Sequence, residues 1–395
     1  MKLNKNQSQK PIFLKLADKK KQMTKLILCS FYFCLFLFAG CQKETSPGGG
    51  ETNKPQIIKH TGTALLSQAR SDMAAAAAGN KMLFAGGYYT DAMGDDHSSK
   101  TVDIYDVVTN NWTVAQLSEA RENLAAAGAG NKIVFAGGTE EGGFGRGSKV
   151  VDIYDIVTGI WTTAELSVAR ENLAAAAAGN KIVFAGGNGT YTSDYSKVVD
   201  IYDVVTGIWT TAELSVARHR LGAAASGNKI YFGGGLNGFA SKTVDIYDVV
   251  TGVWATDELS KPRGFLAAAS SGNKILFAGG IDPLSTDHVA LYKTIDIYDK
   301  ATGLWTTGSL SEGADIPTGT GLGDKILFAG GVNVDYSDAV DICDVVTGKW
   351  ETLKLSVART GMASAGTGNK ILVAGGIGTS AEIDLKMVDI FTLSR

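Results

Sequence analysis

The stretch LAAAAAGNKIVFAGG, from Leu173 to Gly187, decides how the rest of the chain is interpreted. Its five alanines favour a helix, but Gly179-Asn180 and Gly186-Gly187 leave no room for a helix of useful length. Versions of GNKIVFAGG recur, and the first glycine of the closing pair falls at positions 86, 137, 186, 234, 279, 330 and 375. These steps of 45 to 51 residues indicate a repeat architecture.

A second phrase follows the glycine pair in each unit, as in VDIYDIVTGIW, which ends at Trp161. Each unit therefore holds four short runs rich in Val, Ile, Tyr, Phe and Trp, separated by Gly-Asn and Thr-Gly turn signals. This pattern predicts a four-stranded antiparallel meander. All six tryptophans of the chain occupy the same slot, at positions 112, 161, 209, 254, 305 and 350.

The order of glycine pair, strand tyrosine, Thr-Gly or Thr-Asn turn and tryptophan resembles the kelch repeat over residues 57–395. The resemblance implies an all-β, seven-bladed kelch-type β-propeller with four-stranded blades. Alanine runs suit its inner strands, because these crowd the axis and need small side chains. The last unit stops before a tryptophan strand, and residues 57–70 align with the tail of a unit. We therefore expect the N-terminal strand to close the last blade and remove an open sheet edge.

The N-terminal region has a different character. The apolar run Leu26–Gly40 follows several lysines and is shorter than the ~20 residues of a membrane span, so it fits a signal-peptide core. It ends in FAGC, which resembles the bacterial lipoprotein box and implies lipid on Cys41. An uncleaved membrane anchor is the alternative, and Met23 is a plausible true start.

The expected domains are therefore a signal peptide over residues 1–40, a lipidated flexible tether over 41–56 and the propeller over 57–395. Gln42-Lys-Glu44 loosely resembles a tag that sends lipoproteins to the cell surface. We expect the protein to be anchored by lipid at the outer membrane, facing outward, and to contact the membrane through that lipid alone.

Cysteine content and charge exclude several classes. Cys29, Cys34 and Cys41 lie in the N-terminal region, so Cys343 has no partner for an intramolecular disulfide. A net charge of −3 gives no global attraction to nucleic acid. The chain has no phosphate-binding loop, dinucleotide fingerprint or zinc-ligand spacing. We expect a monomer without cofactor or metal.

The clearest chemical signal is an arginine that recurs sixteen residues before the glycine pair, with Ala314 in its place in the sixth unit. This slot lies in the connection between blades, so the arginines are expected to ring the channel mouth on the face of the variable loops. A planar guanidinium suits carboxylate, sulfate or phosphate ligands. Salt bridges within the rim, for instance to Glu122 or Glu171, are the structural alternative. The candidates are Arg70, Arg121, Arg170, Arg218, Arg263 and Arg359.

Aromatic residues in the variable loops are a second set of candidates, because exposed rings stack on sugars or protein side chains. Together these features predict a module that binds a protein or an anionic glycan through its variable-loop, arginine-rimmed face, and not an enzyme. The loop aromatics are Tyr89, Phe144, Tyr191, Tyr195, Tyr292 and Tyr336.

Two enzymatic relatives of the kelch fold are the alternatives. A periplasmic sialic-acid mutarotase would use Glu122, Glu171 or His219 as acid or base. A copper radical oxidase of the galactose oxidase type would need clustered tyrosines, histidines and a cysteine. The four histidines lie in different units, and Cys343 occupies a strand tyrosine slot, so neither alternative is favoured.

Overall fold

The structure is a computed structural model that describes residues 56–140, 146–189, 194–284, 293–332, 335–378 and 383–395. The predicted signal peptide, Cys41 and the tether up to residue 55 lie outside the described residues. By its internal contacts the chain divides into Met1–Asn53 and Lys54–Arg395, and every described strand belongs to the second part. Within the described ranges, no helix has the length and apolar character needed to cross a bilayer.

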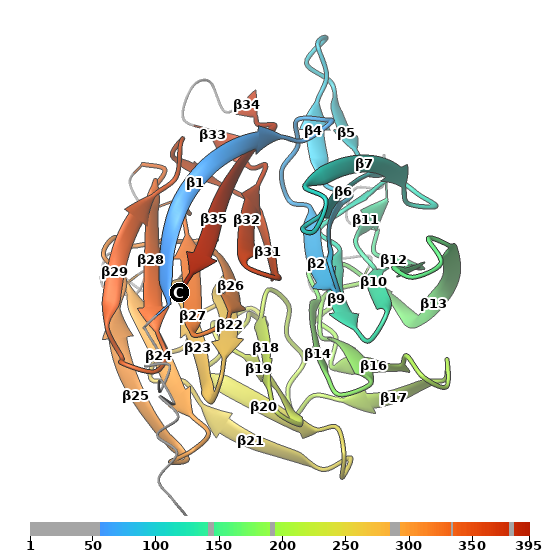
Figure 1. Ribbon diagram of the computed structural model, residues 1–395. Coiled ribbons are helices and arrows are strands. Elements are labelled where there is room, and N and C mark those ends of the chain that lie inside the picture. Colours follow the sequence, from blue (N-terminus) through green and yellow to red (C-terminus); the bar gives the residue numbers. More distant parts are fainter. Residues whose placement is uncertain (1–55, 141–145, 190–193, 285–292, 333–334, 379–382) are drawn as a thin grey trace, which may run out of the picture. The chain divides into compact units, whose positions relative to one another are not determined.

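Each repeat folds into a four-stranded antiparallel sheet, as predicted, and the described residues form seven such sheets (Figure 1). From the inner strand outward, the first three are β2 (Ala74–Ala78), β3 (Lys81–Ala85), β6 (Thr101–Asp106), β7 (Asn111–Gln116); β9 (Ala125–Ala129), β10 (Lys132–Ala136), β12 (Ser148–Asp155), β13 (Trp161–Arg170); and β14 (Ala174–Ala178), β15 (Lys181–Ala185), β16 (Val198–Asp203), β17 (Trp209–Glu213).

The remaining sheets follow the same order. They are β18 (Gly222–Ser226), β19 (Lys229–Gly233), β20 (Thr243–Asp248), β21 (Trp254–Glu258); β22 (Ala267–Ser271), β23 (Lys274–Ala278), β24 (Thr294–Asp299), β25 (Leu304–Ser309); β26 (Thr318–Leu322), β27 (Lys325–Ala329), β28 (Ala339–Asp344), β29 (Trp350–Lys354); and β31 (Ala363–Thr367), β32 (Lys370–Ala374), β35 (Met387–Ser394), β1 (Ile57–Leu65).

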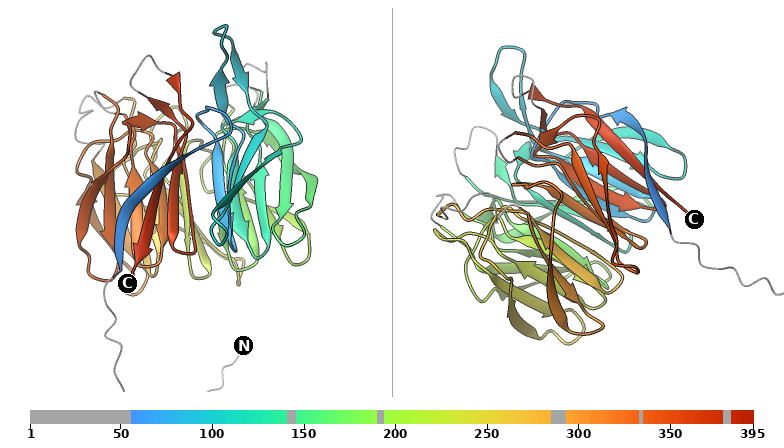
Figure 2. Two further views of the ribbon diagram at one scale, coloured as in Figure 1. Left: turned by 45° about the horizontal axis from the view of Figure 1, so that its top comes forward. Right: turned by 90° about the vertical axis from the view of Figure 1, so that its left-hand side faces the viewer.

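The alanine runs are inner strands, which resolves the conflict between their helix propensity and the flanking glycines. Each inner strand contacts the next, in the order β2, β9, β14, β18, β22, β26, β31, and β31 contacts β2. Both views of Figure 2 show blue N-terminal and red C-terminal strands side by side. A cavity of about 340 Å³ remains between them. A Cβ added to Gly128 on β9 would clash with the carbonyl oxygen of Ala77 on β2. Tertiary crowding therefore selects small residues here, whatever their helix propensity.

The core lies between neighbouring sheets. In the second strand of the third sheet, residues 182–185 are 0% exposed, and the rings of Tyr202 and Trp209 on the third and fourth strands lie 4.8 Å apart. Both rings pack into a cluster with alanines and branched side chains of the second sheet. The repeated aromatic residues therefore pack one sheet against the next.

The two ends of the chain meet in the seventh sheet. Strand β1 pairs antiparallel with β35, with Ile57 opposite Ser394 and Leu65 opposite Met387. The register shifts between His60 and Gly62, where one strand bulges. The N-terminal segment thus pairs with the last unit, as the alignment of residues 57–70 predicts.

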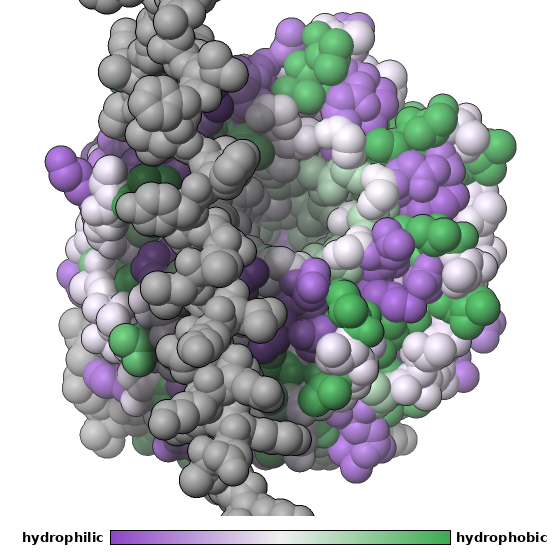
Figure 3. All heavy atoms as spheres, turned by 60° about the horizontal axis from the view of Figure 1, so that its bottom comes forward, coloured by the Kyte–Doolittle hydropathy of each residue, from purple (hydrophilic) through white to green (hydrophobic). Residues whose placement is uncertain are grey.

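The sheets present two different faces. The turn face carries the short turns from first to second strand and from third to fourth strand, which adjoin: Val204 N–H donates to the Asn180 carbonyl (2.9 Å). Figure 3 views this face, hollowed at its centre. The opposite loop face carries the sheet-to-sheet connections and the longer loops. Its short strands are β4 (Tyr88–Thr90), β5 (Asp96–Ser98), β8 (Arg121–Glu122), β11 (Thr139–Glu140), β30 (Arg359–Thr360), β33 (Ile377–Gly378) and β34 (Ile383–Asp384).

Candidate functional site

The six arginines predicted to line the channel mouth are buried. Each is 0% exposed, and its guanidinium contacts an aspartate carboxylate on the third strand of the sheet that follows it. We call this set the arginine ring. The pairs are Arg70–Asp103, Arg121–Asp152, Arg170–Asp200, Arg218–Asp245, Arg263–Asp296 and Arg359–Asp389.

Arg170 illustrates what each pair does. Its Nη1 donates to the carbonyls of Gly186 (2.7 Å) and Val198 (2.6 Å), and its Nη2 donates to Asp200. The other oxygen of Asp200 accepts the backbone N–H of Ser167 (3.0 Å). Burial lowers the pKa of Arg170, and the charge of Asp200 opposes that effect. The pair therefore fastens the sheet-to-sheet connection to the glycine corner and to the third strand.

The glycine pair itself is required by this close approach. Gly186 and Gly187 have φ of 69° and 100°, in the left-handed region that favours glycine. A Cβ on Gly186 would lie 2.5 Å from the carbonyl oxygen of Arg218, which belongs to the next connection. The repeated glycines and the repeated arginines are therefore two parts of one corner.

The prediction that the arginine ring binds a ligand is corrected by this geometry. A guanidinium that is 0% exposed and paired with a carboxylate cannot reach a surface ligand while the connection stays folded. Glu122 and Glu171 are not the partners either. The sequence does hold a signal for the true partners: an aspartate lies between two apolar residues in runs such as VDIYD, where an unpaired carboxylate would be costly.

The sixth sheet shows how the corner forms without an arginine. Ala314 takes its place, and Asp341 accepts the backbone N–H of Ser311 (2.9 Å), as the equivalent aspartates do in the other sheets, and also the hydroxyl of Thr352 (2.8 Å). A cavity of only about 10 Å³ remains beside Ala314.

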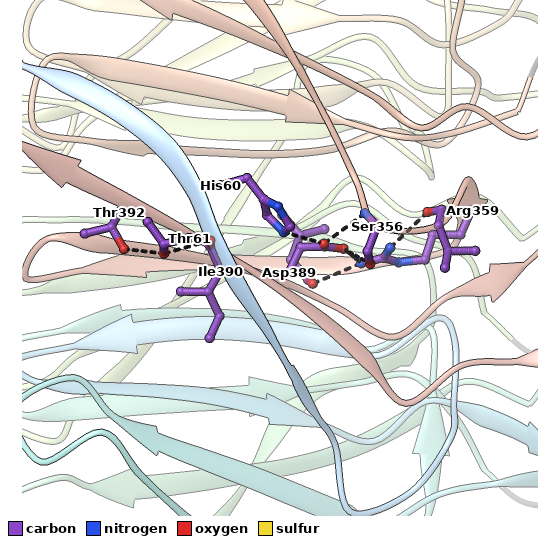
Figure 4. A network of polar contacts seen from close by, with 9 residues as sticks. His60, Thr61, Ser356, Arg359, Asp389, Ile390 and Thr392 are labelled. Atoms are coloured by element: carbon purple, nitrogen blue, oxygen red, sulfur yellow. Dashed lines mark hydrogen bonds and ion pairs between the residues drawn. The ribbon is translucent and has the colours of Figure 1, made fainter.

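The seventh sheet adds a partner from the other end of the chain. Arg359 Nη2 donates to Asp389 Oδ2 (2.6 Å), and Ser356 donates its backbone N–H to Asp389 Oδ1 (2.9 Å). His60 on β1 places its Nε2 2.8 Å from the same Oδ1 (Figure 4). The N-terminal strand and the last repeat therefore share one buried carboxylate.

The loop-face end of the central cavity is lined by residues two positions after the arginine slot. We call them the mouth, and all seven have φ between 50° and 65°. Their backbones are linked in series: Asn123 N–H donates to Asp72 O (3.2 Å), and Asp72 N–H donates to Gly361 O (3.0 Å). They line a cavity of about 250 Å³. The mouth comprises Asp72, Asn123, Asn172, Arg220, Phe265, Ile316 and Gly361.

Arg220 is the only cation among the mouth residues, and unlike the arginine ring it is half-buried and lies on an aromatic ring. Its guanidinium carbon lies 4.0 Å from the centre of the Phe265 ring, a cation–π contact. Its Nε is buried and has no hydrogen-bond partner in the described part of the chain. Burial lowers the pKa of Arg220, and the charges of Asp72, Glu171 and Asp315 oppose that effect.

Carboxylates surround Arg220 and outnumber it. Asp72 faces the cavity, and desolvation raises its pKa to about 6. Asp315 is half-buried, and desolvation raises its pKa to about 6 as well. Desolvation also raises the pKa of Glu122 to about 7, and repulsion from Asp72 and Glu171 adds to this rise. Together with Glu122 and Asp315, which directly precede two of its residues, the mouth is therefore acidic, whereas the sequence led us to expect a positively charged opening.

One histidine lies next to the mouth. His219 directly precedes Arg220, and its ring stacks on Tyr195 at 5.2 Å. Desolvation, and next the charge of Arg220, lower the pKa of His219 to about 4, so it is neutral at pH 7.

The loop aromatics are less exposed than predicted where the structure describes them. Tyr89, Tyr195 and Tyr336 are half-buried, and Tyr89 stacks on His97 at 5.3 Å. Their rings are therefore partly used in packing. Phe144, Tyr191 and Tyr292 lie outside the described residues.

Metal-ligating residues do not gather in the described ranges, where no three His, Cys, Asp or Glu side chains are placed to hold an ion. Burial raises the pKa of the Cys343 thiol to about 11, so the thiol stays protonated at neutral pH. The His and Cys residues that a copper radical site would need thus form no such group there. His288 lies outside the described residues.

Comparison with known proteins agrees with the repeat pattern. No curated protein matches the chain. Residues 72–280, more than half of the chain, match the KLHDC2/KLHL20/DRC7 Kelch-repeats domain. This match confirms the resemblance carried by the glycine pairs, strand tyrosines and tryptophans. The repeated four-stranded sheets and the family match together show that the chain belongs to the kelch-repeat β-propellers.

Proposed function

We propose that this kelch domain is a protein-interaction module that receives a basic side chain of its partner in the mouth. Kelch repeats generally mediate protein interactions, which supports binding over catalysis. The acidic mouth at the centre of the loop face is the observation that carries the proposal. Asp72 lines a cavity of about 250 Å³, large enough for the end of one arginine or lysine side chain, and Asp315 directly precedes Ile316 of that lining.

A closed ring of seven blades is part of this proposal. The contact of β31 with β2 supports it, since these are the inner strands of the last and first sheets. The hydrogen bond from Asp72 to Gly361 and the pairing of β1 with β35 join the same two regions. A closed ring would hold the mouth rigid, so that a partner side chain enters a preformed site.

Anionic glycans are not proposed as ligands. Their recognition rested on the arginine ring, which is buried and paired with aspartates. At the mouth the excess of carboxylates over Arg220 would repel a uronate or sulfate. A periplasmic sugar enzyme is not proposed either, because the matched family does not support it.

Lipid anchoring through Cys41 completes the proposal. The apolar run Leu26–Gly40 and the FAGC sequence support it. The anchored chain would present its loop face to partners outside the outer membrane.

The test uses short fluorescent peptides that differ in one central residue: arginine, lysine, citrulline or glutamate. Anisotropy with the full chain is expected to show binding of the two basic peptides only. Asp72→Asn/Asp315→Asn should weaken that binding by about tenfold, the effect of ~1.4 kcal/mol. Glu351→Gln removes an exposed carboxylate on β29 and serves as the matched control. Preference for glutamate or citrulline, or equal binding by the double variant, would refute the basic-partner proposal.

A further inference from the structure

Apolar side chains stand at the tips of the turns on the face opposite the mouth. In the second, third and fourth sheets each turn from third to fourth strand carries two of them. The valine that leads each pair is between 71% and 77% exposed. Figure 3 shows hydrophobic groups alternating with polar ones around the rim of this face. We call the set the turn patch: Val157, Ile160, Val205, Ile208, Val250 and Val253.

The fold does not need these side chains. Asp203 Oδ1 accepts the backbone N–H groups of Val205 (2.9 Å) and Thr206 (3.0 Å), which shapes the turn. The fifth sheet makes the same turn with alanine: Ala301 N–H donates to Asp299 Oδ1 (2.9 Å). Turn tips normally carry polar residues, so exposed valines that play no part in packing point to a contact outside the chain.

The charges of the turn face are largely paired with each other. Lys181 Nζ lies 2.7 Å from Asp203 Oδ2, and the same pair recurs in other sheets. This leaves the apolar tips as the groups that can gain most from leaving water. The repeated pairs are Lys81–Asp106, Lys132–Asp155, Lys274–Asp299 and Lys325–Asp344.

The described chain begins on this same face. The side-chain oxygen of Gln56 accepts the backbone N–H of Asp324 (3.0 Å), in a turn between first and second strands. Cys41 precedes Gln56 by 15 residues, a span of at most ~50 Å when extended and ~20 Å on average if flexible. A lipid on Cys41 would therefore keep the turn face close to the bilayer and raise its effective concentration there.

From these observations we propose that the turn face docks on the lipid bilayer, with the turn patch in the headgroup region. The inference rests on the membrane tether of the proposed function. The patch lies in the second to fourth sheets, and single exposed valines, Val108 and Val346, occupy the same turns of the first and sixth sheets. Gln56 contacts the sixth sheet, so tether and patch would hold the face at different sheets. The mouth would then point away from the membrane. Apolar side chains presented on firm turns are well suited to shallow insertion.

The chain contains its own probes for this contact. Trp161, Trp209 and Trp254 directly follow the second apolar residue of their turns, and all six tryptophans of the chain occupy this slot. Each of these three indoles is half-buried. Quenching of tryptophan fluorescence by lipids that carry a nitroxide on the headgroup therefore reports on the turn face alone.

The experiment reconstitutes the full chain, made with its own leader, in phosphatidylcholine vesicles with and without the nitroxide lipid. The vesicle-bound fraction is collected by flotation before fluorescence is measured. We expect quenching in the wild type and its loss in Val157→Asn/Val205→Asn/Val250→Asn. Met93→Asn, which removes an 89% exposed side chain on the loop face, is the matched control and should keep the quenching.

The outcomes separate docking from anchoring. Vesicle-bound protein without quenching, or equal quenching in the triple variant, overturns docking. A dimer in detergent that the triple variant abolishes would assign the patch to self-association and also overturn it. The mass of the Cys41 peptide tests acylation independently, because the apolar Leu26–Gly40 run can hold an unacylated chain on vesicles. A chain that does not float with vesicles contradicts both proposals.

Discussion

Arg218 and Arg220 lie two residues apart in one connection, and the structure gives them opposite surroundings. Arg218 is 0% exposed, pairs with Asp245 and donates to the carbonyls of Gly234 (2.6 Å) and Thr243 (2.6 Å). Arg220 is half-buried and lies over the ring of Phe265 in the mouth. The first slot repeats in six connections because the same corner must be built each time. The second slot varies, which leaves it free for recognition.

The largest expected effect comes from removing each arginine in turn. Arg218→Ala leaves Asp245 buried without its counter-charge, so the free energy of unfolding should fall by about 3–5 kcal/mol. Arg220→Ala removes a cation–π contact and the attraction of nearby, partly solvated carboxylates, and should cost about 1 kcal/mol. Urea denaturation followed by tryptophan fluorescence measures both losses. Equal losses would contradict the distinction, and Asp245→Asn added to Arg218→Ala should restore part of the stability.

The sixth sheet sharpens the comparison. Ala314 occupies the arginine slot there, so replacing the aspartate leaves no ring arginine unpaired. Asp341→Asn removes a charge that is held by a backbone N–H and a hydroxyl, so we expect a loss of ~1–2 kcal/mol. Asp245→Asn leaves Arg218 buried and unpaired, for which about 3–5 kcal/mol is expected. The same denaturation curves compare the two variants. A loss at Asp341 as large as at Asp245 would show that the aspartate, and not the ion pair, holds the corner.

The smallest expected effect is the pH dependence of the mouth. The pKa of Glu122 is raised to about 7 in the folded chain, so its contribution to stability is present below pH ~4.5 and is lost as the pH rises through about 7. Melting temperatures of the wild type should therefore fall between pH 5 and pH 8. In Glu122→Gln the melting temperature should fall less over this range. The difference corresponds to less than about 1 kcal/mol in the free energy of unfolding, because the site is partly solvated.

In Glu122→Gln the melting temperature should still depend on pH to some extent, because desolvation raises the pKa of both Asp72 and Asp315 to about 6. Glu351→Gln, at an exposed site on β29, should leave the wild-type slope unchanged. If the melting temperature of Glu122→Gln fell with pH as steeply as that of the wild type, the Glu122 carboxyl would be hydrated in the folded chain and its pKa would not be raised.

Much of the fold follows from the repeats. The glycine pairs, the turn signals and the tryptophan slots predict four-stranded sheets and the pairing of residues 57–70 with the last unit, because these depend on local turn geometry and alternation. The site does not follow in the same way. The repeated arginines suggest an open ring, but a residue's exposure depends on what packs over it, and here that is Asp103 and its counterparts some thirty residues further on.

By itself the sequence determines the repeat, the kelch family and the positions of the turns, since each depends on residues that are close together in the chain. Only the tertiary structure decides that one arginine is buried while another, two residues later, faces the mouth. The reason is physical: the inner strands meet at the axis, and that convergence sets which side chains lose water and which carboxylates gather. The acidity of the mouth arises from Asp72, Glu122 and Asp315, which come from three different connections.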